Sequence, residues 1–172
     1  MRKKSARDAV AGGLPAIYPR LWRFCLVLTR DRAMAEDLAQ MTCERALIHA
    51  DKFTPGSDLA SWLFTMARNL WLNDIRAANV RRGTGTVPVE QSGLTDEKPD
   101  IEANILAREV FDIIQALPEA QRLTTLLVYV EGHTYREAAE ILDVPIGTIM
   151  SRLASARKAV TQVVEGQEKT GE

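Results

Sequence analysis

The chain has 172 residues, 46% of them hydrophobic, and a formal net charge of −1 at pH 7. That length can bury one core or two small ones, and no apolar run approaches the roughly 18 residues that a membrane-spanning helix needs. A charge this close to zero also argues against a protein that binds nucleic acid strongly by itself, because such proteins are usually basic.

Two helices are predicted in the N-terminal part of the chain. Apolar residues recur at helical spacing from about Leu14 to Leu28, and Asp31 is expected to cap a second helix. Cys25 and Cys43 lie in these helices without a CxxC or Cys/His pattern, which indicates reduced thiols and no metal site. The N-terminus lacks the apolar core of a signal peptide, so we expect a cytoplasmic protein.

The second helix has two different faces. Its expected inner stripe consists of Ala35, Leu38, Ala39, Thr42 and Ala46. Its outer face carries Glu36, Asp37, Gln40, Glu44 and Arg45. Such a polar face on an isolated surface helix is normally solvated, so these residues alone indicate no partner.

A loop containing Pro and Gly, residues 52–57, precedes a third helix that Ser57 or Asp58 is expected to cap and that runs to Arg76. Aromatic residues interleave here with amides and guanidinium groups: Phe53, Trp62, Arg68, Asn69, Trp71 and Asn73. Such aromatics are most often part of a core. Aromatic faces beside Asn and Arg also fit contact with unpaired bases, and the sequence leaves both interpretations open.

Residues 81–100 show no sustained periodicity and are rich in Gly, Pro, Thr and acids, which predicts a flexible linker and a domain boundary. A basic block, with four arginines against one aspartate, covers residues 68–82. An acidic block, with five acids against one lysine, covers residues 90–102. This alternation suits a protein that touches DNA at two patches while another molecule supplies most of the affinity.

Two helices are expected after this boundary. Asp100 caps the first in our prediction, and its apolar side consists of Ile101, Ile105, Val110, Ile113 and Leu117. Pro118 lies in the first turn of the second, where a fixed φ suits a helix start. That helix is expected to bury Leu123, Leu126, Leu127 and Val130 and to end at Gly132.

The segment from Thr134 to Val160 predicts a helix-turn-helix. Thr134 and Glu137 form a capping-box pattern, so a helix should begin at Tyr135. Asp143 stands where a left-handed turn is needed, a conformation that Asp tolerates. Pro145 then suits the first turn of the next helix.

The second helix of this motif is expected to pack through Ile149 and Leu153. Its opposite face carries Gly147, Thr148, Met150, Ser151, Arg152, Ser155, Arg157 and Lys158. Small and hydroxyl residues at a helix N-terminus, with cations further along, suit a helix that lies in the major groove and meets phosphates. Helix pairs with a tight turn also occur as plain packing units, so the motif alone leaves that alternative open.

No strand pattern of period two and no internal repeat occur in the chain. We therefore predict an all-α protein with two small helical domains joined by a flexible linker, the C-terminal domain containing the helix-turn-helix.

Four segments in this order carry a family resemblance: AEDLAQMTCERAL, SWLFTMARNLWLNDIR, LPEAQR and TYREAAEILDVPIGTIMSRLASARKAV. Over about residues 14–164 the chain resembles the extracytoplasmic-function group of bacterial RNA polymerase sigma factors. The resemblance implies a region 2 domain over residues 10–80, which binds core polymerase and the −10 promoter element. It implies a region 4 domain over residues 101–165, which reads the −35 element, with a linker between them.

The resemblance also implies roles for individual residues. Polymerase contacts fall on Asp37, Leu38 and Gln40. Recognition and opening of the −10 element fall on Phe53, Ser57, Asp58, Trp62, Arg68, Asn69, Asn73 and Arg76. Contacts with the −35 element fall on Gly147, Thr148, Met150, Ser151, Arg152, Arg157 and Lys158. Such a protein has no cofactor, and an anti-sigma factor is its expected regulator.

The sequence departs from the family pattern at a few positions. Met41 stands where an acid is usual, and Met150, Ala154 and Ser155 replace bulkier or basic residues of the recognition helix. We therefore expect a −35 interaction that leans on Arg152, the later cations and DNA shape.

Two other functions remain as alternatives. One is an operator-binding helix-turn-helix regulator, which would bind DNA tightly as a dimer. The other is a sigma-like decoy that sequesters an anti-sigma factor. An enzyme is the least supported class, because no triad, phosphate loop or paired-carboxylate pattern occurs.

Overall fold

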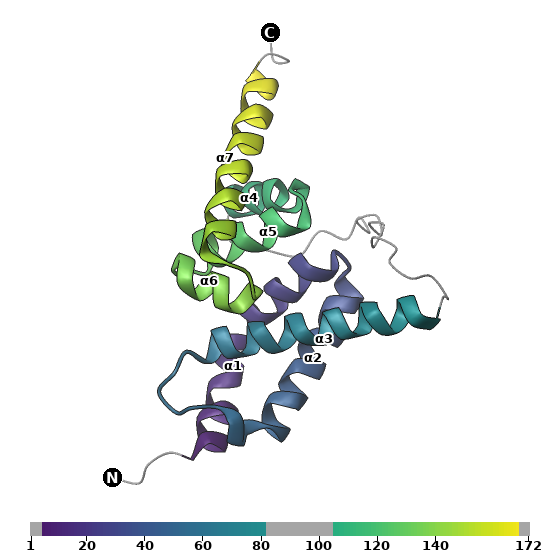
Figure 1. Ribbon diagram of the computed structural model, residues 1–172, viewed down its shortest axis with the longest axis vertical. Coiled ribbons are helices and arrows are strands. Elements are labelled where there is room, and N and C mark those ends of the chain that lie inside the picture. Colours follow the sequence, from purple (N-terminus) through teal and green to yellow (C-terminus); the bar gives the residue numbers. More distant parts are fainter. Residues whose placement is uncertain (1–4, 82–104, 169–172) are drawn as a thin grey trace. The chain divides into compact units, whose positions relative to one another are not determined.

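Helices form two separate units in the computed structural model, which describes residues 5–81 and 105–168 (Figure 1). The first unit contains α1 (Ala6–Thr29), α2 (Arg32–Ile48), the short 3-10 helix η1 (Ala50–Lys52) and α3 (Leu59–Arg81). The second contains α4 (Ile105–Ala116), α5 (Glu119–Thr125), the π-helical turn η2 (Leu126–Val130), α6 (Tyr135–Leu142) and α7 (Ile146–Glu168). The described residues include no strand, and the predicted all-α class is confirmed.

Some predictions fall on residues that the structure does not describe. They concern most of the linker at 81–100, the cap at Asp100 and the apolar residue Ile101, all of which lie outside the described ranges.

The first unit is built from three helices that pack on one another. Asp31 caps α2 as predicted, since its carboxylate accepts a 2.8 Å hydrogen bond from the Met34 N–H. The predicted inner stripe of α2 is buried throughout. Between α1 and α3, the rings of Phe24 and Phe64 stack with centroids 4.6 Å apart, and both side chains are fully buried. These apolar contacts position α2 and α3, which carry the predicted site residues of this unit.

Helix α1 begins two turns earlier than predicted. It starts at Ala6, where the Ser5 hydroxyl accepts a hydrogen bond from the Asp8 N–H, and it continues through two prolines. Glycines and prolines at residues 12–19 weaken the helical signal of the sequence, which is why the prediction began at Leu14. Val10 is fully buried, so tertiary packing stabilises these early turns.

The second unit differs from prediction in which residues face inward. Leu123, Leu126 and Leu127 are buried as expected, but Val130 is 41% exposed and the prediction for it was wrong. The cause is the π-helical turn, in which the Glu131 N–H bonds to the Leu126 carbonyl at 2.9 Å, five residues back. Each such bond widens the turn and rotates the following residues out of the α-helical phase.

Two further predictions for this unit concern the buried side of α4 and the end of the helix that follows. Among the residues of α4 whose side chains are described, the buried apolar ones are Phe111 and Ile114, whereas the predicted Ile113 is only partly buried. The end of the second predicted helix is confirmed, since Gly132 follows η2 with a φ of +76°.

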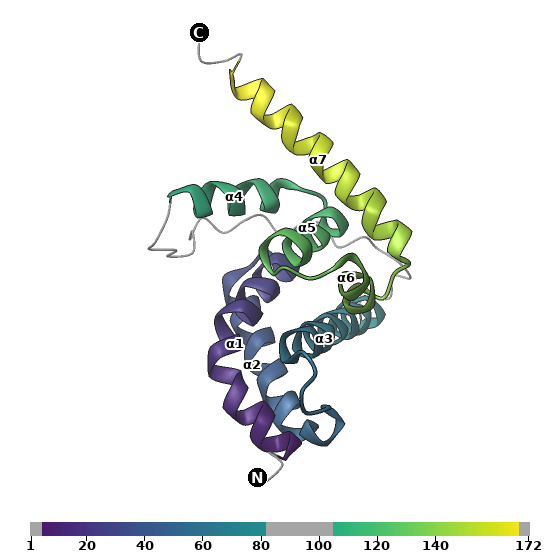
Figure 2. The same ribbon diagram turned by 90° about the vertical axis from the view of Figure 1, so that its left-hand side faces the viewer.

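The helix-turn-helix is present, with α6 packed against α7 (Figure 2). Both halves of the capping box form: the Glu137 N–H donates to the Thr134 hydroxyl at 3.2 Å, and the Thr134 N–H donates to the Glu137 carboxylate at 2.7 Å. Asp143 has a left-handed backbone with φ +51°. Ile149 and Leu153 are fully buried, which confirms the prediction that α7 packs through these two residues.

Both cysteine side chains belong to the first unit. Cys25 is buried and Cys43 partly buried, both are free, and burial raises the pKa of each thiol. Among the described residues, no cluster of His, Cys, Asp or Glu has the arrangement of a metal site. None of the described helices is both long enough and apolar enough to span a bilayer.

Candidate nucleic-acid interface

One polar stripe runs along α3 on the side away from the core. At 100° of rotation per residue, Trp62, Asn69, Asn73 and Arg76 fall within an arc of about 60°. The buried residues of α3, from Ala60 to Trp71, lie on the opposite side of the helix. The stripe therefore offers an aromatic face, two amides and a guanidinium group on one line, which can stack on a base and hydrogen-bond base edges or phosphates.

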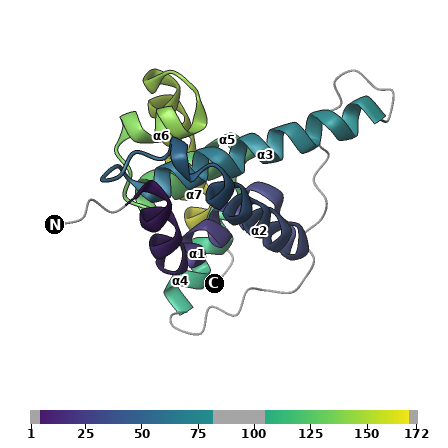
Figure 3. The same cartoon turned by 90° about the horizontal axis from the view of Figure 1, so that it is seen from below.

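The guanidinium groups near this stripe differ in their surroundings. Arg76 and Asn73 are exposed and linked by a 3.5 Å contact from the Arg76 Nη1 to the Asn73 Oδ1. Arg68 is only partly exposed, lies outside the arc, and makes a 3.5 Å contact with the Asn69 Oδ1. The C-terminal half of α3 extends beyond α1 and α2 in both Figure 1 and Figure 3, which leaves Asn73 and Arg76 accessible.

The N-terminus of α3 carries the next group of predicted site residues. Asp58 caps the helix, because its carboxylate accepts from the Ser61 N–H at 3.0 Å and from the Ala60 N–H at 3.3 Å. Ser57 instead donates its hydroxyl to the Thr54 carbonyl at 2.7 Å, inside the preceding loop. The sequence left the cap open between the two residues, and the structure assigns it to Asp58.

The aromatic residues divide between core and surface. Phe53 and Trp71 are buried, so the core interpretation holds for them. Trp62 is only partly buried, and its ring packs against Phe53 with centroids 5.3 Å apart at an angle of 49°. One part of the Trp62 ring therefore rests on the core while another part is open to a ligand.

A second surface lies on the outer side of α2. Asp37 and Gln40 are exposed, and Gln40 donates a hydrogen bond to the Glu44 carboxylate at 3.1 Å. Leu38 is only 4% exposed and belongs to the core of the unit. Its side chain therefore supports this helix and is not available on the surface.

This α2 surface has an apolar component that sequence reasoning missed. Met34, Met41 and Ile48 are 43%, 37% and 72% exposed, and their spacing of seven residues keeps them within an arc of about 40°. The seven-residue recurrence was visible in the sequence. It was overlooked because apolar residues at helical spacing are normally assigned to a core.

A third surface is the exposed side of α7. Ser151 donates its hydroxyl to the Thr148 carbonyl of its own helix at 3.0 Å, and Arg157 contacts the Tyr129 hydroxyl at 3.4 Å. The other predicted residues of this helix are also accessible at least in part: Gly147, Met150, Arg152 and Lys158. The middle of the face is made of small residues, so a DNA backbone or base edge can approach α7 closely.

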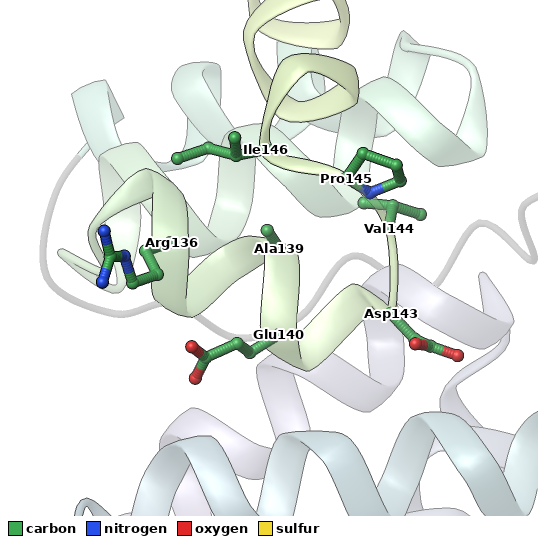
Figure 4. A pocket seen from close by; sticks show the side chains of 7 residues that line it. All are labelled: Arg136, Ala139, Glu140, Asp143, Val144, Pro145 and Ile146. Atoms are coloured by element: carbon green, nitrogen blue, oxygen red, sulfur yellow. The ribbon is translucent and has the colours of Figure 1, made fainter.

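An open pocket of about 530 Å³ lies beside the turn between α6 and α7 (Figure 4). It is lined by Arg136, Ala139, Glu140, Asp143, Val144, Pro145 and Ile146. The lining has apolar residues around the turn and charged residues at the rim. It contains no Ser, Cys or His that could act as a nucleophile or general base.

Comparison with known proteins gives a consistent result for both units. The family model for sigma-70 region 2 matches residues 16–81, and that for sigma-70 region 4 matches residues 107–160. The ECF RNA polymerase sigma factor EcfG of Rhodopseudomonas palustris is 34% identical over 166 residues, covering 95% of this chain and 91% of the relative. The ECF sigma factor SigL of Mycobacterium tuberculosis is 32% identical, covering 92% and 93%.

Two solved structures have a similar fold. The sigma factor RpoE of Bartonella quintana, in complex with the anti-sigma factor NepR, is 28% identical with a TM-score of 0.67, covering 90% of this chain and 96% of that one. CnrH, in complex with the cytosolic domain of CnrY, is 19% identical with a TM-score of 0.61, covering 91% and 88%.

Proposed function

This chain belongs to the extracytoplasmic-function (ECF) group of RNA polymerase sigma factors, and we propose how its surfaces divide the work of starting transcription. A sigma factor directs RNA polymerase to promoters. Region 2, over residues 10–80, binds core polymerase and the −10 element in this proposal. Region 4, over residues 101–165, reads the −35 element, and the residues between them connect the two.

The α3 stripe binds the −10 element as single-stranded DNA. Trp62 stacks on an unpaired base, while Asn69, Asn73 and Arg76 contact base edges and phosphates. Their common line on α3 and their exposure support this role. Arg68 lies to one side of the stripe and is assigned a flanking phosphate contact.

The loop before α3 shapes the same site. Ser57 and Asp58 are exposed next to the start of the helix, and the bonds of Asp58 to the first turn hold that end in place. Phe53 is buried, so its role is to support the Trp62 ring and not to touch DNA. Opening of the promoter DNA strands then needs no catalytic group. Unstacking a base costs a few kcal/mol, and binding of the unpaired base to the protein offsets this cost.

The outer surface of α2 docks on core polymerase. Asp37 and Gln40 supply polar contacts, and the exposed Met34 and Met41 supply apolar area. Leu38 contributes by holding α2 against the core of the unit.

Helix α7 binds the −35 element in the major groove. Arg152, Arg157 and Lys158 neutralise phosphates or donate to guanine edges. The small or short residues Gly147, Thr148 and Ser151, together with Met150, form the part of the face that approaches the bases.

A protein partner is also proposed. The Bartonella quintana relative is bound to an anti-sigma factor, which supports an anti-sigma factor as the regulator of this chain. The similarity to the sigma factor EcfG supports a cytoplasmic location, where core polymerase and the promoter are found.

Transcription with purified core RNA polymerase on a library of promoter fragments tests the proposal. We expect initiation that depends on this protein, from sites that share a −10 and a −35 element. Capture of an anti-sigma factor, without binding to core polymerase and without initiation on any fragment, would instead support the decoy function. Tight dimeric binding of the free chain to duplex DNA would support the operator-binding regulator.

The role of the α3 stripe can be tested separately from polymerase binding. Arg76→Ala should slow promoter opening roughly tenfold, the effect of losing one phosphate or base contact, and leave polymerase affinity unchanged. Arg81→Ala is the matched control, because Arg81 is exposed on the same helix but lies about 140° away around its axis. Equal effects of the two substitutions, or an equal loss of opening and polymerase binding in Arg76→Ala, would remove Arg76 from the proposed site.

A further inference from the structure

The first two turns of α1 lie outside the matched sigma-70 region 2, which begins at residue 16, yet they belong to the packed part of the unit. Val10 is fully buried, and α1 contacts the short helix η1 that precedes the loop before α3. Figures 1 and 2 both show the beginning of α1 beside the segment that joins α2 to α3. This part of α1 therefore lies near the segment that leads from η1 to the start of α3.

At Gly13, α1 lies in direct contact with the side chain of Leu59 in α3. A Cβ atom built on Gly13 would overlap the Cδ2 atom of Leu59, so an alanine here would force the Leu59 side chain to rotate or to shift with its backbone. Gly12 is next to it in the same helix, and a Cβ atom built there would meet nothing within 4 Å. The contact with Leu59 thus depends on a missing side chain at one position of α1.

Leu59 is well placed to transmit a shift. It is the first residue of α3 and follows Asp58, whose carboxylate accepts hydrogen bonds from the Ala60 and Ser61 N–H groups. Trp62 is one turn further on, with its ring against Phe53. Where the packed Leu59 side chain has no room to rotate away from an added Cβ atom, it has to shift together with its backbone, and this shift moves Asp58 and Trp62 as well.

We propose that the first turns of α1, Ala6–Gly13, form a brace for the −10 site, and that Gly13 is a positioning residue within it. Its lack of a side chain leaves room for Leu59, so the start of α3 can lie close to α1, and this close approach sets where Asp58 and Trp62 meet the unpaired bases. This inference rests on the proposed function of the α3 stripe and adds a segment to it that does not touch DNA.

The pair Gly13→Ala and Gly12→Ala tests the brace in the full-length protein bound to core polymerase. Both substitutions raise helix propensity by the same amount, so they differ only in the contact with Leu59. We expect Gly13→Ala to lower promoter opening roughly tenfold, measured by permanganate reactivity of unpaired thymines, since small misplacements at a preorganised site have effects of this size. Gly12→Ala should open promoters like the wild type.

Two further measurements separate positioning from loss of fold. Affinity for core polymerase should be the same in both variants, and a parallel loss of affinity and opening in Gly13→Ala would overturn the proposal. Leu59→Ala, introduced into Gly13→Ala, removes the atom that collides and should restore most of the opening. If Gly13→Ala opens promoters normally, or if Leu59→Ala brings no recovery, the brace is refuted.

A Trp62→Ala variant shows which of the two proposals has failed. If Trp62→Ala abolishes opening while Gly13→Ala is normal, the −10 site stands and the brace falls. If Trp62→Ala itself opens promoters normally, the assignment of the α3 stripe is wrong, and any effect of Gly13→Ala has another origin.

Discussion

At the scale of single residues, the turn of the helix-turn-helix depends on Asp143. Its φ of +51° lies in the left-handed region, where an L-residue with a Cβ atom is strained by roughly 1–2 kcal/mol. In this conformation its N–H bonds to the Glu140 carbonyl at 3.2 Å, and the Val144 N–H bonds to the Ala139 carbonyl at 3.0 Å. These bonds close α6 and set the direction in which α7 leaves the turn.

Substitutions at Asp143 should follow this conformational preference. Asp143→Ala is expected to destabilise α6 by about 1 kcal/mol, because Ala tolerates the left-handed region less well than Asp, whereas Asp143→Gly should not. Hydrogen exchange of the α6 amides measures the local opening. Glu140→Ala, which removes a neighbouring exposed carboxylate within the helix, controls for charge and should change stability by less than about 0.5 kcal/mol. An Asp143→Ala protein as well protected as the wild type would show that the turn carries no strain.

At the scale of elements, α2 and α3 each have one face in the core and one face available to a partner. In α2 the inner face consists of small residues and Leu38, which lets the helix pack closely on its neighbours. The outer face mixes Asp37 and Gln40 with exposed methionines. An exposed apolar line beside charged groups is typical of a protein interface, where the apolar area gives affinity and the charges give specificity.

Reversing one charge on this face should weaken docking without unfolding the helix. Asp37→Arg is expected to reduce affinity for core polymerase by roughly tenfold or more. The substitution reverses the charge that faces the partner, and like charges opposite each other at an interface cost up to several kcal/mol. The melting temperature should stay within about 2 °C of the wild type, since Asp37 is exposed. Asp51→Arg reverses another exposed carboxylate, on η1 and outside α2, and serves as the control in the same binding assay. Equal affinities of the two variants would take α2 out of the interface.

At the scale of the whole molecule, the two proposed DNA-binding surfaces belong to a chain with a net charge of −1. A protein that binds DNA alone normally gains most of its affinity from phosphate neutralisation by a basic surface. In this protein each proposed DNA-binding surface is small, and RNA polymerase brings both surfaces to the promoter. Once one element is bound, the other unit binds at a high effective concentration, so weak contacts are sufficient.

The free protein should therefore bind promoter duplex weakly, with a dissociation constant in the range of non-specific binding, roughly 10⁻⁴–10⁻⁶ M at physiological salt. The complex with core polymerase should bind the same fragment at least about a hundredfold more tightly. Fluorescence anisotropy with labelled DNA at several salt concentrations measures both. A free chain that binds the duplex in the nanomolar range would contradict the shared-affinity argument and favour an operator-binding regulator.

Features that depend on neighbours in the chain could be read from the sequence. The caps at Asp31 and Thr134 and the left-handed turn at Asp143 each depend on residues a few positions apart, and the spacing of Ile149 and Leu153 places both on one face of a helix. The order of the motifs was also sufficient to identify the family, because several motifs that occur together in a fixed order are far more specific than any one of them. On these points prediction and structure agree.

Other features have no clear signal in neighbouring residues of the sequence, and there only the three-dimensional structure decided. Val130 faces outward because a π-helical turn shifts the helical phase, and the early turns of α1 form because Val10 has a core to enter. Trp62 is half open while Phe53 is buried, a difference that composition cannot show. Local bonding determined where α2 and α6 start. Which of their side chains reach the surface was determined by packing between elements far apart in the chain.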